Sequence, residues 1–254
     1  MKIFRSCACA AYAILVSLPL YAQQDSNKGD LQKAYRQIIE GRITADFEAR
    51  SNLVSKALEE GSMPSRFSLF YWYGVVLYLD ELIKEGSAES LSIVEKTGPL
   101  IRDLVIASAQ AVKSDVSDAG DAVLFAQGEF VRLYEFADSE SLLTNEDKAL
   151  IEESIARGAN HLVSRREERG SMNRAAVLGY GLAETIRILP NHRSVRDWME
   201  LEEAIWQDWA HFMDTYEDAS GYNGLWFIGI IKHALVSGRE DVLQEEAFLD
   251  LVER

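Results

Sequence analysis

From Leu31 onward, apolar residues recur at every third or fourth position, in segments that short polar stretches separate. This period is that of an amphipathic α-helix, whose apolar residues form one buried stripe. The clearest stripe consists of Trp198, Leu201, Ile205, Trp209, Phe212 and Tyr216. The pattern predicts helices at residues 29–41, 44–60, 65–85, 88–114, 119–138, 145–168, 173–189, 195–216, 222–237 and 239–253.

Residues that favour helix ends stand between these segments. Glycine is common just after a helix because it adopts a positive φ at little cost. The glycines at predicted helix ends are Gly61, Gly86, Gly170 and Gly238. Thr144 with Asp147, and Ser194 with Asp197, have the spacing of a capping box, which marks a helix start.

No segment alternates apolar and polar residues between hairpin turns, so we predict no strand. Residues 67–78 are the most strand-like by composition, but the apolar run continues to Ile83 and favours a buried helix. Tyr71, Trp72 and Tyr73 are consecutive on this helix and should not all face inward. We therefore expect one or two of them to line a groove.

The links between consecutive predicted helices are short, which predicts antiparallel helical hairpins. Without an internal sequence repeat, these hairpins fit either an α/α toroid or an irregular α-solenoid. The predicted fold class is therefore all-α.

The first 22 residues have the features of a secretory signal peptide. A basic start and an apolar core at 10–20 precede Ala22, a small residue suited to cleavage. The apolar stretch is shorter than the roughly 20 residues of a membrane span. We expect residues 1–22 to be removed, 23–30 to be a polar leader, and 31–254 to form the helical domain of a periplasmic or secreted protein.

Removal of residues 1–22 changes the composition. Both cysteines of the chain, Cys7 and Cys9, would be lost, so we expect no disulfide and no thiol nucleophile. The chain has 26 basic and 41 acidic residues, and the loss of Lys2 and Arg5 gives a net charge of −17. This charge disfavours nucleic acid as a partner. An anionic ligand stays possible, because the local field of a site can oppose the net charge.

Several other classes of protein are disfavoured by the absence of their motifs. A hydrophobic content of 48% favours a folded core over disorder. We find no metal-ligand spacing and no glycine-rich phosphate loop, and we expect no cofactor. No segment after the signal peptide is long and apolar enough to predict stable membrane insertion.

Polar side chains suited to chemistry concentrate between residues 165 and 226. The cationic cluster of this region consists of Arg165, Arg166, Arg169, Arg174, His192 and Arg193. Asn173 opens one predicted helix, and a later acidic loop, 217–222, ends at Tyr222. These segments stand at helix ends, which meet at one rim when alternate helices run in the same direction.

The Asn173-Arg174 helix start and the acidic loop ending at Tyr222 resemble the toroid portion of α/α-barrel polysaccharide lyases that act on uronic-acid polymers such as alginate or glucuronan. In that family, an Asn, often followed by His, lies at a helix start, and a Tyr on a later acidic loop acts as acid, base or both. The resemblance covers about residues 145–235. It differs at Arg174, where many members have His, and in lacking the β-rich domains that commonly follow.

This resemblance implies an incomplete α/α toroid and an acidic polysaccharide as substrate. Because the helical pattern is still running at residues 249–254, we expect the chain to be a fragment of a longer enzyme. The chemistry would be β-elimination, with Asn173 and Arg174 stabilising the substrate carboxylate and Tyr222 moving the proton. We expect further substrate contacts from Arg165, Arg169, His192, Glu217, Asn223 and Trp226.

Each of these residues also has a structural interpretation. Asn173 is a preferred N-cap residue, and Trp226 is either a sugar-stacking platform or part of the core. Two other functions stay open from the sequence. One is a glycoside hydrolase with Glu217 or Asp218 as its general acid, which needs a second carboxylate. The other is a non-catalytic helical scaffold whose arginines bind a protein partner.

Overall fold

The computed structural model describes residues 37, 41, 45, 47–117, 119–166, 172–212 and 220–253. It describes only the backbone at residues 67, 89–90, 121, 172–173, 211–212, 220–225 and 251–253. Within these ranges all regular structure is helical and no strand occurs. The prediction of an all-α fold is confirmed, whereas the predicted signal peptide and most of the helix at 29–41 lie outside the described residues.

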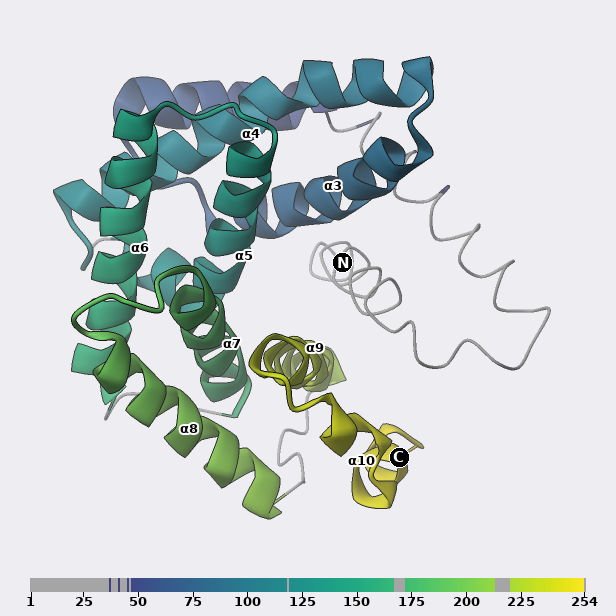
Figure 1. The fold of residues 1–254 in the computed structure, drawn as a ribbon, viewed down its shortest axis with the longest axis vertical. Coiled ribbons are helices and arrows are strands. Elements are labelled where there is room, and N and C mark those ends of the chain that lie inside the picture. The colour runs from purple at the N-terminus through teal and green to yellow at the C-terminus, as the bar shows by residue number, and fades with distance from the viewer. Residues whose placement is uncertain are drawn as a thin grey trace. The chain divides into compact units, whose positions relative to one another are not determined.

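The helices follow the predicted order, with boundaries that differ by a few residues (Figure 1). They are residues 47–60, α3 (Arg66–Glu85), α4 (Ala88–Ser114), α5 (Gly120–Ser139), α6 (Asn145–Ser164), α7 (Met172–Ile188), α8 (Val195–Phe212), α9 (Ser220–Ser237), the 3₁₀ helix η3 (Glu240–Gln244) and α10 (Glu246–Glu253). The prediction of one helix at 239–253 is wrong. Glu245 has an extended backbone (φ −68°, ψ 141°), which separates η3 from α10.

The local end signals explain this agreement. Gly61, Gly86 and Gly238 have φ of 60°, 65° and 69°, as predicted for glycines after a helix, while Gly170 lies outside the described residues. The Thr144–Asp147 capping box is confirmed. The Thr144 N–H donates to Asp147 Oδ2 (2.9 Å), and the Asp147 N–H donates to Thr144 Oγ1 (3.2 Å). Hydrogen bonds from the Thr144 hydroxyl and N–H lower the pKa of the Asp147 carboxyl below its ordinary value of 3.8.

The chain divides into two compact units. Unit 1 comprises Met1–Ala111 and Leu133–Ile151, and unit 2 comprises Val112–Arg132 and Glu152–Arg254. The boundaries fall inside α4, α5 and α6. Because all of α7, α8 and α9 belongs to unit 2, most of the predicted site residues are in that unit.

Helix α3 contributes many side chains to the core of unit 1. The side chains of Tyr71, Trp72 and Tyr73 are 8%, 0% and 7% exposed, so the prediction that one of them lines a groove is wrong. A helix that is apolar on every face is buried on every face. In agreement, the Phe47 ring meets the Trp72 ring edge-on at 6.1 Å, and the Arg50 guanidinium lies 4.9 Å from the centre of the Tyr71 ring.

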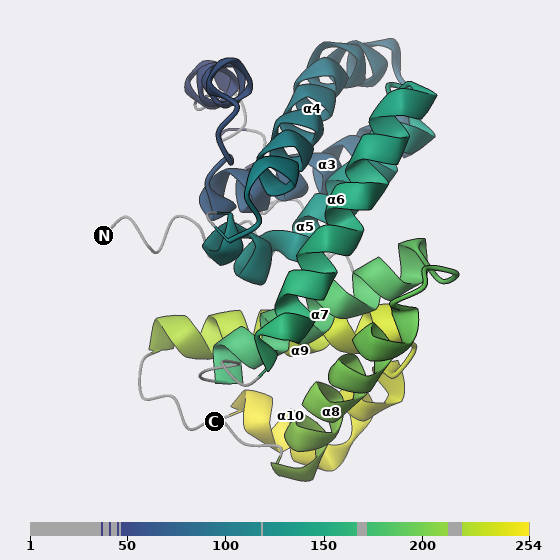
Figure 2. The ribbon, with the colours of Figure 1, turned by 90° about the vertical axis from the view of Figure 1, so that its left-hand side faces the viewer.

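In unit 2 the stripe predicted on α8 faces the core. Trp198, Leu201, Ile205 and Trp209 are buried, whereas the Phe212 side chain and Tyr216 lie outside the described residues. Helix α7 packs against both α8 and α9, and Figure 2 shows α7 and α9 side by side. Among the described helices of the chain, none combines the length and the apolar character that crossing a bilayer requires.

Candidate functional site

Helices α7 and α9 run parallel and in close contact, which brings their N-terminal ends to the same end of unit 2. A Cβ added at Gly229 of α9 would lie 2.8 Å from the Ala176 Cβ of α7. A Cβ added at Gly179, one turn further along α7, would lie 2.7 Å from the His233 ring, one turn further along α9. Contacts advance together along the two helices, so both helices point in the same direction.

This register determines how Asn173 and Tyr222 are placed on the backbone. Asn173 lies three residues before Ala176, and Tyr222 lies seven residues before Gly229. At about 1.5 Å per residue, Tyr222 is therefore displaced by about 6 Å along the common axis. With axes about 8 Å apart, the two backbones are separated by on the order of 10 Å. The side chains of Asn173 and Tyr222 are outside the described residues, and their convergence stays a prediction.

Two further helix ends lie at this end of unit 2. The Arg174 guanidinium of α7 is 5.9 Å from the ring centre of Phe125, in the second turn of α5. A Cβ added at Gly120, the first residue of α5, would lie 3.2 Å from His161 Nε2, in the last turn of α6. The N-terminal ends of α5, α7 and α9 and the C-terminal end of α6 are thus neighbours, and we call this region the N-terminal face of unit 2.

The described basic residues of the N-terminal face favour an anion. Arg174 is exposed at the start of α7, and Arg165 and Arg166 are exposed just after α6. Helix N-termini carry a partial positive charge and free N–H groups, so three neighbouring N-termini add to the field of these arginines and exceed the opposing partial charge of the single α6 C-terminus. Arg169 and Glu217 belong to the segments 167–171 and 213–219 and lie outside the described residues. Asn223 is in the first turn of α9, and its side chain is not described.

Neither Trp226 nor His192, two other predicted substrate contacts, presents an exposed side chain at the N-terminal face. Trp226 is 1% exposed and packs against the rings of Trp209 and Phe227, which is the environment of a core residue and not of a sugar-stacking platform. His192 follows α7 and is therefore at the opposite end of that helix from Asn173. Trp226 is thus near the start of α9 but covered by core residues, and His192 is at the far end of α7.

His192 has a structural contact that explains its position. Its ring stacks on the Trp198 ring, with centres 4.6 Å apart and planes 8° apart. The Ser194 N–H donates a hydrogen bond to His192 Nδ1 (3.1 Å). Because Nδ1 accepts, the neutral ring carries its proton on Nε2. His192 thus orders the turn that leads into α8.

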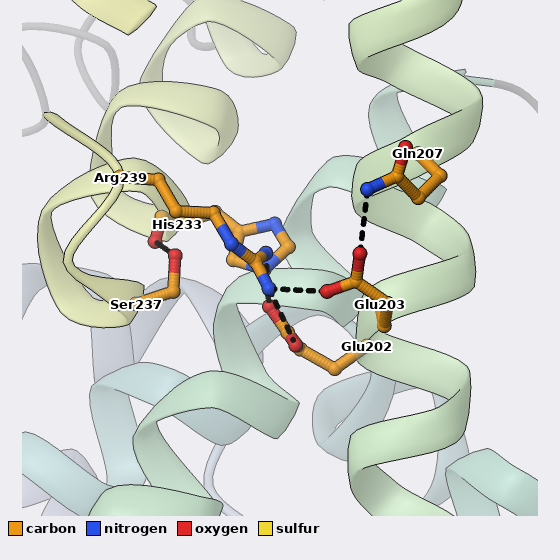
Figure 3. Close-up of polar contacts among 6 residues, drawn as sticks. All are labelled: Glu202, Glu203, Gln207, His233, Ser237 and Arg239. Atoms are coloured by element: carbon orange, nitrogen blue, oxygen red, sulfur yellow. Dashed lines mark hydrogen bonds and ion pairs between the residues drawn. The ribbon is translucent and has the colours of Figure 1, made fainter. Parts of the chain in front are cut away.

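Sequence reasoning missed a largely buried polar cluster formed by Glu202 on α8, His233 on α9 and Arg239 just after α9 (Figure 3). Glu202 Oε1 accepts hydrogen bonds from His233 Nε2 (2.5 Å) and from Arg239 Nη1 (2.8 Å). His233 is 0% exposed and Glu202 is 6% exposed. Arg239 also donates to Glu203 Oε2 (2.5 Å) and lies 4.9 Å from the ring centre of Trp206. The cluster ties the end of α9 to the middle of α8.

The electrostatics of this cluster favour an ionised Glu202. Burial disfavours the carboxylate, but the hydrogen bonds from His233 and Arg239 and the positive charge of Arg239 outweigh burial. The pKa of Glu202 is consequently lowered from its ordinary value of 4.5. A group whose pKa is lower in the folded state stabilises the protein above its unfolded pKa, and this stability is lost as the pH falls through the folded value.

We expect Glu202→Gln to lower the free energy of unfolding by about 1.5–3 kcal/mol at neutral pH, because it removes charged hydrogen bonds in a buried place. Glu203→Gln is the matched control. It removes an ion pair of Arg239 whose carboxylate is 49% exposed, so we expect a loss below about 1 kcal/mol. Urea unfolding between neutral pH and pH values below 4.5 should show a weaker pH dependence in Glu202→Gln than in the wild type. Equal slopes in the two proteins would contradict the role given to Glu202.

Within the described residues, no group of three or more His, Cys, Asp or Glu side chains is arranged to hold a metal ion. Comparisons with protein-family models, curated proteins and solved structures find no match for this chain. A functional proposal therefore has to be argued from the residues of this chain alone.

Proposed function

We propose that this protein is an exported polysaccharide lyase that cleaves a uronic-acid-containing polymer by β-elimination. In this proposal residues 1–22 direct export, to the periplasm or beyond, and the helical hairpins belong to an incomplete α/α toroid. The observation that carries the proposal is the common location of the α7 and α9 N-termini, where the backbones of Asn173, Arg174 and Tyr222 are neighbours.

The chemistry explains why these residue types suit the reaction. A base removes the proton α to the uronate carboxylate, the glycosidic C–O bond at the β-carbon breaks, and the departing oxygen takes a proton. The α-proton is a very weak acid unless the carboxylate charge is stabilised by hydrogen bonds or cations. Asn173 and Arg174 supply an amide and a guanidinium for that purpose, and the helix N-termini add N–H donors. Tyr222 serves as base, as acid, or as both in turn.

The electrostatics of the N-terminal face fit an anionic polymer. The protein as a whole has a net charge of −15, which repels a polyanion at long range. The exposed Arg165, Arg166 and Arg174 oppose this charge locally, and local fields in concave or helix-terminal sites decide binding. An acidic polysaccharide is therefore directed to this face and away from the rest of unit 2.

A panel of polymers tests the proposal directly. The full chain is incubated with alginate, glucuronan and polygalacturonate, and with the neutral polymer cellulose as control. A lyase creates an unsaturated uronate, whose ultraviolet absorbance rises with time on one of the acidic polymers and not on cellulose. New reducing ends without that absorbance would identify a hydrolase. No product from any uronate polymer would contradict the proposal and favour a binding scaffold.

Arginine variants locate the substrate within unit 2. We expect Arg174→Ala to lower kcat/KM on the responding polymer by about 100-fold, as expected for a donor that stabilises charge in the transition state. Arg196→Ala is the matched control, because Arg196 is 89% exposed on α8 and pairs only loosely with Glu200 at 3.5 Å. Initial rates over a range of polymer concentrations give kcat/KM for each of the two variants. Equal losses in the two variants would exclude a specific role for Arg174.

A further inference from the structure

One buried side chain, that of His233, lies where α7, α8 and α9 come together. His233 projects from α9, and its Nε2 is held by Glu202 of α8. A Cβ at Gly179 of α7 would lie 2.7 Å from both Cε1 and Nδ1 of the His233 ring. The ring thus occupies the space that any side chain at position 179 needs. Three helices meet at this imidazole, which has no exposed surface.

The imidazole has little freedom to move. The edge of the Trp206 ring approaches it with centres 5.1 Å apart and planes at 82°. The Ile205 side chain would be 3.0 Å from a Cβ at Gly179, so it closes the pocket from the side of α8. Packing at this density transmits a displacement of one helix to its neighbours. We therefore expect a displacement of the His233 ring to displace α9 relative to α7.

We propose that His233, held by Glu202 and seated against Gly179, is a positioning residue that sets the offset between Tyr222 on α9 and Asn173 on α7. The inference rests on the proposed function, since it concerns the same pair of helix ends. His233 lies three turns from Tyr222 along a continuous helix, and Gly179 lies less than two turns from Asn173. His233 touches no substrate and acts through the backbone of α9.

A structural measurement tests the offset without reference to activity. A spin label is attached to Arg174→Cys in the full chain with Cys7→Ser and Cys9→Ser, and the paramagnetic relaxation of the Tyr222 amide is recorded by NMR. This relaxation depends steeply on distance. We expect Gly179→Ala to change it, because the added Cβ pushes the His233 ring and α9 away. Gly41→Ala is the matched control, since a Cβ at that helical glycine meets nothing within 4 Å.

Compensation separates positioning from a general loss of structure. Adding His233→Ala to Gly179→Ala removes the ring that the new Cβ meets, so the Tyr222 relaxation of the double variant should match that of His233→Ala alone. The double variant should also be more stable than the sum of the single losses predicts. His233→Ala alone introduces no clash and serves as the second variant if Gly179→Ala does not fold. If the paramagnetic relaxation of the Tyr222 amide is unchanged in both single variants, the inference is overturned.

Activity of the unlabelled variants gives an independent result. A displacement of about 1 Å in a catalytic group lowers kcat by up to about 100-fold while KM changes little. We expect this split in Gly179→Ala and partial recovery in the double variant. If the wild type shows no lyase activity but the Tyr222 amide responds as expected, the proposed function fails and the positioning inference stands. If the wild type is an active lyase and the amide does not respond, only the positioning inference fails.

Discussion

Replacing Tyr222 with phenylalanine should lower the elimination rate on the responding polymer by about 1,000-fold, within the range of roughly 10²–10⁴ that a positioned acid or base contributes. The substitution removes one hydroxyl and keeps the ring. Because Tyr222 lies in the first turn of α9, the change should leave the unfolding midpoint in urea close to that of the wild type. The measurement is the initial rate of ultraviolet absorbance, together with the KM for the polymer.

Tyr180→Phe is the control for this experiment. Tyr180 is on α7, about 10 Å along the helix from Asn173, and is 3% exposed, so it cannot contact a polymer. We expect its loss to leave kcat within about threefold of the wild type, as for a residue outside the reacting groups. A Tyr222→Phe protein that retains full activity would remove Tyr222 from the mechanism, and the lyase proposal would then lose its proton carrier.

The helices could be predicted from the sequence because their signals are local. The positive φ of Gly61, Gly86 and Gly238, and the Thr144–Asp147 capping box, depend on residues within a few positions of each other. Glu245 carries no comparable signal, since glutamate is a good helix former. Its extended backbone separates η3 from α10. The short α10 beyond this break packs on unit 2 through the contact of the Phe248 ring with the Trp209 ring.

Burial depends on partners that periodicity does not reveal. An amphipathic helix is expected to bury only one side, so we expected one or two of the residues Tyr71–Tyr73 to line a groove. This expectation is wrong, because all three side chains are buried. The same limit applies to Trp226, whose ring is in the core of unit 2. In both segments apolar residues surround the helix, and such a helix is itself the signal of complete burial.

The sequence predicts which helix ends lie at the same end of unit 2, but not the side-chain contacts between those helices. Alternating helix directions are enough to place the starts of α7 and α9 at the same end of unit 2, and His192 at the other. The contact between Glu202 and His233 joins residues 31 positions apart, and no pattern in the sequence pairs them. The small size required at Gly179 and Gly229 follows from the same close approach of α7 and α9, which only a structure reveals.

The buried ion pair between Lys232 of α9 and Glu129 of α5 provides the second large expected effect. Lys232 Nζ lies 2.7 Å from Glu129 Oε1, and the two side chains are only 10% and 5% exposed. The same ammonium lies 5.0 Å from the ring centre of Tyr180 on α7. The pair therefore joins α5 and α9 across the face of α7, in the core of unit 2.

Lys232→Met should lower the free energy of unfolding by about 3–5 kcal/mol, because it leaves the Glu129 carboxylate buried without its cation. The double variant Lys232→Met/Glu129→Leu removes both charges and should recover most of that loss, since an apolar pair of similar volume has no desolvation cost.

The control is Lys56→Met, which breaks a 3.7 Å pair with Glu60 between side chains that are 67% and 55% exposed. Its expected effect is below about 0.5 kcal/mol. Urea unfolding at neutral pH measures all three variants. A double variant less stable than Lys232→Met would contradict the assignment of the loss to a Glu129 carboxylate buried without its cation.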